Sequence, residues 1–577
     1  MVKARMATGM VTAMAAKLFF DVTVMDQFPR KSFLEPRSRG TERRGQESNV
    51  KAHTATNSTY RRFLLCGALM AGFAMPVLYA QTPSPATPSE LPAVNYAPAF
   101  RVMPSVVLSE RYTDNAALLT SAAAQSDWVT DAAVGLHIDY RSARAIAMLD
   151  YRVNRLLHGQ YSNLDTTQRN LGSSATLEAV EKWLFLDARA SVTQQNRSAF
   201  GAAGIADITS TSANRVETTT YQVSPYIRGN FTDAATYFLR LNGAESHTNE
   251  SAIPDSRTYQ WNGFVKNAPS AGRLGWSVDG NAFSFDNNTV DKRYNSIVRG
   301  TVTFEVDGQL HMSFSAGRES SDLDGLGRRV TNSPGLGLEW SPSQRTQMAA
   351  VTQKRFFGND HLVALAHRTA LTAWRFASAR EIAFSTVDLA GSSPVSVNAL
   401  LLDLLASAIP DPIARAEAAQ RRFAQTGIPA ASGIQDGLLN VRPFLSRHQE
   451  ASVALIGTRN TATLSFGRRE QRAIDSNSAV PGGGPPIEEF RQLSANAAWA
   501  YRLSPVSTLR MVASYLRTEG IFSENLASTQ RLQSLFFVTQ LGPRTSTSLG
   551  LQRITFDSTV VNSYRENAFV ASLSVHF

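Results

Sequence analysis

The most regular pattern in the chain is an alternation of hydrophobic and polar residues with a period of two. Segments of about ten residues carry it from position 99 onward, for example 134–140, 302–306 and 493–503. A period of two belongs to β-strands, because successive side chains point to opposite faces of a sheet. The sequence therefore predicts many strands, each of them apolar on one face only.

The connections between these segments alternate between short turns and longer polar stretches. Residues 458–460 and 504–505 read as turns, whereas 196–218 and 474–487 read as long loops. Short periplasmic turns and long outer loops are typical of bacterial outer-membrane barrels, and tilted membrane strands need about 9–11 residues. A soluble sandwich or propeller also alternates, but it does not explain the loop pattern. We expect an all-β fold, a transmembrane antiparallel up-and-down β-barrel of about 22 strands (roughly 18–24) over residues 99–577.

The last strand predicts how the barrel is assembled. Apolar residues occupy every second position up to an aromatic carboxy-terminus, as in outer-membrane barrel proteins. We expect the outer-membrane barrel assembly machinery to recognise this strand. The residues of the candidate assembly signal are Phe569, Leu573, Val575 and Phe577.

An apolar run near the amino terminus predicts export from the cytoplasm. Arg61 and Arg62 precede the run and small residues close it at Ala80, as in a cleaved secretory signal peptide. An amino-terminal membrane anchor is the alternative, but the run is short for a span of about 20 residues. We expect a spurious extension or a functional cytoplasmic segment over 1–59. The signal peptide then covers 60–80, and a Pro/Ser/Thr-rich linker covers 81–98.

Composition and charge exclude several classes of protein. A mean hydropathy of -0.18 is too polar for a helical membrane protein, and the pI of 9.7 reflects mainly the leader. Of the 57 basic and 47 acidic residues, 12 and 5 precede residue 81, which leaves a net charge of +3 on the remainder. We therefore expect no nucleic-acid partner. The single cysteine, Cys66, lies in the leader, so the mature chain has neither thiol catalysis nor disulfides.

The period of two breaks down over residues 393–446. Leu401 and Leu404 lie at helical spacing, and Asp411 followed by proline is a typical helix start, since its carboxylate accepts free backbone N–H groups. Arg415 falls in the helix that follows. We expect a helical insertion in one extracellular loop, which either enters the lumen as a gate or plug or forms a self-packed cap outside it.

Charged residues recur on the polar face of the strands. If the apolar face meets lipid, these side chains point into the lumen. Arginine offers a planar fork of donors that suits the carboxylates of acidic sugars. The set fits either a lumen that accepts an anionic or polyhydroxylated polymer or an internal ion-pair network that braces the wall. The lumen-facing candidates are Arg189, Arg228, Arg240, Arg299, Arg375, Arg502, Arg510, Asp187 and Glu305.

No motif predicts catalysis or a bound cofactor. The nine histidines are scattered singly, without the spacing of metal ligands, and no glycine-rich phosphate loop of the usual spacing occurs. A Ser, His and Asp set could still assemble across strands without a sequence signature. We expect no enzyme, no cofactor and no metal.

Several motifs occur in the order seen in a known family. They lie at Tyr112-Thr113-Asp114-Asn115, Asp150-Tyr151, 183–188, 224–228, 409–416 and 459–464. With them, residues 98–577 resemble the family of uncharacterised outer-membrane proteins associated with PEP-CTERM/exosortase systems. The resemblance implies a Gram-negative bacterium and a role in exopolysaccharide export or biofilm matrix assembly. The family supplies no catalytic residues.

Three functional hypotheses follow. The leading one is a gated conduit for an exopolysaccharide, embedded in outer-membrane lipid and served by periplasmic export components. The second is a non-conducting barrel that anchors matrix polymer or surface proteins. The third is a general porin for small solutes. Conductance in a lipid bilayer separates the conduits from the anchor.

Overall fold

A computed structural model of the chain describes residues 99–205, 212–231, 234–250, 253–267, 272–287, 290–383, 434, 438–440, 442–474, 489–522 and 525–577. All of them belong to one unit of the chain, Gly72–Phe577. The predicted extension, signal peptide and linker, residues 1–98, lie outside these ranges. No helix within the described ranges is long and apolar enough to cross a membrane.

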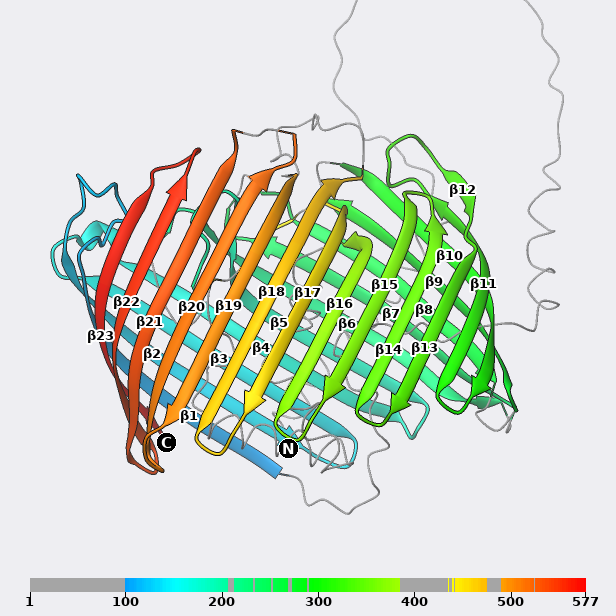
Figure 1. Ribbon diagram of the computed structural model, residues 1–577, viewed down its shortest axis with the longest axis horizontal. Coiled ribbons are helices and arrows are strands. Elements are labelled where there is room, and N and C mark those ends of the chain that lie inside the picture. Colours follow the sequence, from blue (N-terminus) through cyan, green and yellow to red (C-terminus); the bar gives the residue numbers. More distant parts are fainter. Residues whose placement is uncertain are drawn as a thin grey trace, which may run out of the picture. The chain divides into compact units, whose positions relative to one another are not determined.

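The described residues form one antiparallel sheet of 23 strands (Figure 1). A single short 3-10 helix, η1 (Ser162–Leu164), follows β3. The first eleven strands are β1 (Ala99–Thr113), β2 (Asp127–Arg141), β3 (Ala145–His158), β4 (Thr166–Val180), β5 (Leu184–Asn196), β6 (Arg215–Phe231), β7 (Ala235–Thr248), β8 (Ser256–Asn267), β9 (Leu274–Asn287), β10 (Val290–Asp307) and β11 (Leu310–Ser321). The others are β12 (Arg329–Asn332), β13 (Gly335–Ser343), β14 (Thr346–Arg355), β15 (Gly358–Arg368), β16 (Thr372–Ala383), β17 (Phe444–Ile456), β18 (Asn460–Ala473), β19 (Phe490–Arg502), β20 (Ser507–Gly520), β21 (Ala527–Gly542), β22 (Thr545–Ser558) and β23 (Tyr564–His576).

The sheet closes into a barrel with 22 strand positions. Strands β12 and β13 share one position, because both pair with β11 and only Ser333 and Pro334 separate them. Proline has no N–H to donate to the ladder, so the strand is interrupted there. The ring closes where β1 pairs with β23, from Ser105 opposite His576 to Thr113 opposite Ala568. The predicted fold class, strand number and first strand are confirmed.

Side chains bridge the closing seam near the end of the barrel that carries the longer loops, called here the outer end. Arg111 forms an ion pair with Glu566, and the Thr113 hydroxyl donates to the same carboxylate at 2.7 Å. The Asn115 amide donates to the backbone oxygen of Arg565 at 3.0 Å. These contacts tie the first strand to the last, although the paired residues lie about 450 positions apart in sequence.

The outward face of the barrel is apolar. On β18 and β22 the outward side chains include Phe466 and Leu551, each 60% exposed, while the inward neighbours are polar. Near the end with the short turns, aromatic side chains form a girdle: Trp499 stacks on Tyr501 with ring centroids 5.9 Å apart, and Trp183 donates to the Tyr237 hydroxyl at 3.0 Å. An apolar belt with aromatic borders is the surface that a bilayer requires.

Two predicted boundaries change. Strand β17 begins at Phe444, so the last three residues of the predicted insertion belong to the barrel wall, where their backbones pair with β16 and β18. Strand β6 begins at Arg215, inside the predicted loop 196–218. The predicted helical positions Leu401, Leu404, Asp411 and Arg415 lie outside the described residues, and the helical insertion stays a prediction.

Candidate functional site

The loop between β5 and β6, residues 197–214, leaves its own strands and reaches another part of the wall. Its Phe200 and Ile205 contact inward-facing residues of β19, β21, β22 and β23. Strand β19 lies nine positions from β5 around the ring of 22. The loop therefore crosses the outer end of the lumen, and we call residues 197–205 the crossing segment.

Two apolar side chains anchor the crossing segment. Phe200, 5% exposed, contacts Phe490 of β19 and Leu438. Ile205, also 5% exposed, contacts Leu532 of β21 and residues of the two strands that follow. In an ordinary outer loop these two apolar side chains would be exposed to water. Here they are buried against the opposite wall of the barrel.

Gln530 of β21 holds the segment by two hydrogen bonds to one residue. The Ala203 backbone N–H donates to the Gln530 side-chain oxygen at 2.8 Å, and the Gln530 amide donates to the Ala203 carbonyl at 3.0 Å. Both groups belong to a backbone that has left its sheet, so an inward-facing amide supplies the partners that a strand would have supplied.

A second amide gives the segment its shape. Asn214 accepts from the Ser198 N–H at 2.9 Å and donates to the Ser198 and Ala202 carbonyls at 2.9 and 3.1 Å. The backbone passes so close to this side chain that a Cβ on Gly201 would lie 2.4 Å from the Asn214 side-chain carbon. A larger residue at position 201 would therefore displace the Asn214 side chain from these hydrogen bonds.

Residues just before β17 join the crossing segment. Leu438 forms an isolated bridge with Asn196, and the Leu439 N–H donates to the Asn196 carbonyl at 2.8 Å. Ile434 forms a second isolated bridge, with Ile205, which is antiparallel whereas the first is parallel. The described residues at the end of the 384–443 connection therefore lie beside the crossing segment.

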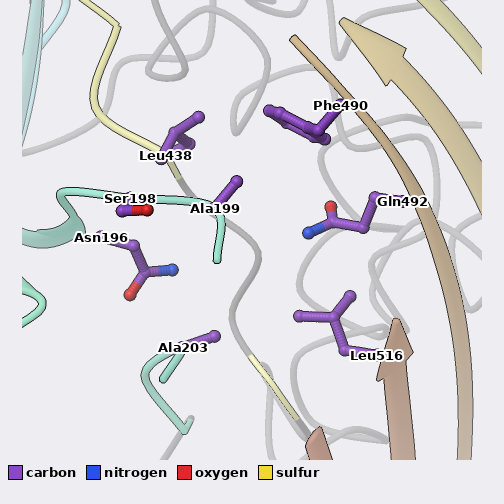
Figure 2. A pocket seen from close by; sticks show the side chains of 8 residues that line it. All are labelled: Asn196, Ser198, Ala199, Ala203, Leu438, Phe490, Gln492 and Leu516. Atoms are coloured by element: carbon purple, nitrogen blue, oxygen red, sulfur yellow. The ribbon is translucent and has the colours of Figure 1, made fainter. Parts of the chain in front are cut away.

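A small pocket lies between the segment and the wall (Figure 2). Asn196, Ser198, Ala199 and Ala203 line it from one side, with Leu438 above them. From the other side come Phe490 and Gln492 of β19 and Leu516 of β20. Its lining is part apolar and part polar. The pocket shows that the side chains of the loop and of the wall do not pack completely against each other here.

The lumen-facing candidates occupy the inner wall, and several of them contact neighbouring side chains of the wall. Arg240 forms an ion pair with Asp187 at 2.8 Å, and Arg299 pairs with Asp279 at 2.8 Å. The Arg228 guanidinium lies 4.5 Å from the centroid of the Phe185 ring. These contacts favour the wall-bracing hypothesis for this group.

The remaining candidates lie apart from that group. Arg510 lies 6.0 Å from the centroid of the Phe536 ring, while Arg375 and Arg502 are half-buried on β16 and β19. Arg189 is exposed to the lumen, with no ion-pair partner among the described residues, and Glu305 lies opposite His311. The structure does not bring these side chains together at one site. In the described ranges, no group of three or more His, Cys, Asp or Glu residues is placed to hold a metal ion.

The four residues of the candidate assembly signal lie at the end that closes the ring. Phe569, Leu573 and Val575 point outward on β23 and pair with Tyr112, Leu108 and Val106 of β1. The Phe577 N–H donates to the Pro104 carbonyl at 2.9 Å. These positions are compatible with recognition of the last strand, which stays a prediction.

No protein-family model matches the sequence, and no curated protein matches it. Among solved structures, the chain is similar to the siderophore receptor PirA from Pseudomonas aeruginosa, with a TM-score of 0.42 and 9% identity over 84% of this chain and 81% of that one. It is also similar to the FrpB iron transporter from Neisseria meningitidis (F3-3 variant), with a TM-score of 0.44 and 8% identity over 82% and 81%. Such identities carry no binding residue of those proteins over to this chain.

Fold and lipid-facing surface together make this an outer-membrane β-barrel. The crossing segment was not foreseen as part of the site, although a sequence signal exists. Phe200 and Ile205 flank small residues and glycines in a loop where exposed polar residues are the norm. Gln530 gives no such signal, because a polar residue is expected at every inward position of a strand.

Proposed function

We propose that the protein is a gated outer-membrane conduit for an exopolysaccharide. The crossing segment is the gate at the outer end, and the polar inner wall is the path. The sequence predicted the helical insertion as the gate, whereas we propose the β5–β6 loop as the main gating element. The insertion keeps the role of a second element, next to the described residues Ile434 and Leu438 that join the segment.

One observation carries the gate. A loop from β5 and β6 is docked on β19 and β21–β23 by two apolar side chains and one bridging amide. A loop that only covered its own strands would not need anchors on the far wall. Among the described residues of the far wall, Gln530 and Ser558 make polar contacts with this segment.

The inner wall beneath the segment supports a hydroxyl-rich cargo. Ser465, Asn496 and Ser514 lie opposite one another on β18, β19 and β20, and Ser534 lies opposite Gln552 on the next two strands. Gln552 is 4% exposed, and neither atom of its amide has a partner among the described residues. Small hydroxyl and amide groups exchange hydrogen bonds with sugar hydroxyls without binding them tightly. The resemblance to exosortase-associated proteins points to the same class of cargo.

The test is single-channel conductance of the refolded full chain in planar bilayers. The variant F200D/I205D places two charges in the apolar anchors, so the segment leaves the wall and the open fraction rises about tenfold or more. The control V560D/V561D changes two apolar residues of the β22–β23 loop that are already exposed, and it leaves conductance unchanged. Added exopolysaccharide then blocks the open variant.

Each alternative function has its own outcome. A silent F200D/I205D variant that is fully folded by circular dichroism would favour the non-conducting surface anchor. An open wild type that ignores the polymer would favour the general porin. An equal gain in both variants would assign the effect to loop charge rather than to the gate.

A further inference from the structure

The outward face of β17–β23 carries a cluster of arginines near the outer end, which we call the basic band. All its members are exposed and have the parity of the lipid-facing residues. The strands of this sector also carry three outward acids, Glu470, Glu519 and Asp557, so the outward face of the sector has a net charge of +5. The arginines are Arg447, Arg468, Arg472, Arg491, Arg517, Arg531, Arg553 and Arg565.

Only part of this charge is neutralised within the sheet. Arg472 pairs with Glu470 and Arg517 with Glu519, both at 2.6 Å, and Arg531 lies 3.3 Å from Asp557. In the described part of the chain, the other five have no ion-pair partner: Arg447, Arg468, Arg491, Arg553 and Arg565. The opposite sector differs. Its outward Arg169 and Arg257 each face a glutamate, at 3.7 and 2.9 Å, and its outward Arg155 and Arg318, which have no ion-pair partner among the described residues, lie on β3 and β11, eight strand positions apart.

The basic band lies at the upper border of the apolar belt. Its members are about eight to twelve residues from the short-turn ends of their strands, which is about 20–30 Å at the rise and tilt of barrel strands. The apolar belt of such barrels is about 25 Å tall. On β22, Arg553 follows the lipid-facing Leu551 by two residues on the same face.

The spacing within the band suits a ligand with several anionic groups. Arg531 and Arg565 are both register partners of Thr555, one strand to either side, so their backbones are about 10 Å apart. Arg553 lies on the strand between them, one outward position from Thr555. Guanidinium forks bind phosphate oxygens in a bidentate manner.

We propose that the basic band binds the phosphate groups of phosphorylated lipids in the outer leaflet of the membrane. The depth of the band places the guanidiniums at the level of lipid headgroups, and the unpaired charge faces the bilayer rather than the lumen. Acyl chains of the same lipid then lie on the apolar side chains below. The band gives the barrel a preferred lipid on one side, independent of what passes through the lumen.

The test uses the full chain in phosphatidylcholine nanodiscs, titrated with lipid A that carries two phosphates. Binding is read as the shift in Tm and as quenching of tryptophan fluorescence by a labelled lipid. The probe variant R468Q/R491Q/R553Q/R565Q removes four arginines without ion-pair partners. The matched control R155Q/R169Q/R257Q/R318Q removes four exposed outward arginines from the opposite sector.

The wild type and the control are expected to bind phosphorylated lipid A at least tenfold more tightly than dephosphorylated lipid A, and the probe variant to lose this preference. Raising the salt concentration should weaken binding of phosphorylated lipid A by the wild type about as much as the four substitutions do. This second measurement tests the proposal even if the probe variant misfolds. Equal affinity for both lipids, or equal loss in the control, would overturn the proposal. Competition by inorganic phosphate at equal affinity would reassign the band to small anions.

Discussion

A buried carboxylate, Glu319, organises the inner wall at the outer end of β11. Its side chain is 0% exposed and accepts three hydrogen bonds from the Arg355 guanidinium at 2.7–3.0 Å. Asn295 and the Phe356 backbone N–H donate to the same carboxylate at 2.9 and 3.0 Å. Burial of a charge is tolerated here because each oxygen has donors from neighbouring strands.

Removing this charge should be costly, whereas removing an exposed one should not. We expect Glu319→Gln to lower the free energy of unfolding by about 3 kcal/mol, because it leaves the buried Arg355 charge with Asp360 as its remaining ion-pair partner among the described residues. The matched change Glu245→Gln breaks an exposed pair with Arg257 and should cost about 0–1 kcal/mol. Urea unfolding in lipid vesicles measures both, and similar losses would contradict the role of burial.

Within the described part of the chain, the crossing segment distinguishes this barrel from an open tube. Its dihedral path depends on Asn214 and Gly201, and its position depends on contacts with strands that are far away in sequence. Elements held by few distant contacts open locally at a lower free energy than the sheet that carries them. The segment should therefore exchange its amide hydrogens before any strand of the wall does.

Gln530 should control how often the segment opens. We expect Gln530→Ala to raise the rate of hydrogen exchange at the Ala203 amide about tenfold, since two bridging hydrogen bonds of about 0.7 kcal/mol each are lost. The control Gln533→Ala changes an outward, exposed glutamine of the same strand and leaves the exchange rate unaltered. If both variants exchanged like the wild type, the segment would be held by its apolar anchors alone.

At the scale of the whole molecule, β23 decides whether the ring closes, because it pairs with both β22 and β1. Leu573 lies on its lipid face, three residues before the end of the strand and thus about 8 Å into the apolar belt, between its border and its middle. We expect Leu573→Arg to destabilise the folded barrel by about 1–2 kcal/mol, because the cost of an arginine rises from the interface toward the midplane. His576 is exposed and faces the lumen, so His576→Arg should have little effect on the stability of the barrel. The heat-resistant folded fraction on a gel measures both, and equal fractions would contradict the assigned faces.

The extent to which the sequence predicted the barrel follows from the range of the forces involved. Alternation is a local property, and a bilayer requires an apolar outward face on every strand, so a stretch of about ten residues is enough to predict each strand. The turns are also predicted from a few neighbouring residues. This is why the strands near Ala99–Thr113 and at the carboxy-terminus, the strand number and the inward parity of Arg240 and Arg299 could be inferred from sequence alone.

Only the tertiary structure decided what the inward residues contact. Whether Arg240 meets Asp187 or a solute depends on the register of three strands, and whether Phe200 is exposed or buried depends on a wall nine strand positions away. The ion pair joins residues 53 positions apart and the docking of Phe200 on Phe490 joins residues almost 300 apart, and no local pattern encodes either contact. The sequence by itself determined a membrane barrel with a polar lumen. The tertiary structure placed the loop across that lumen, because packing against the far wall removes Phe200 and Ile205 from water.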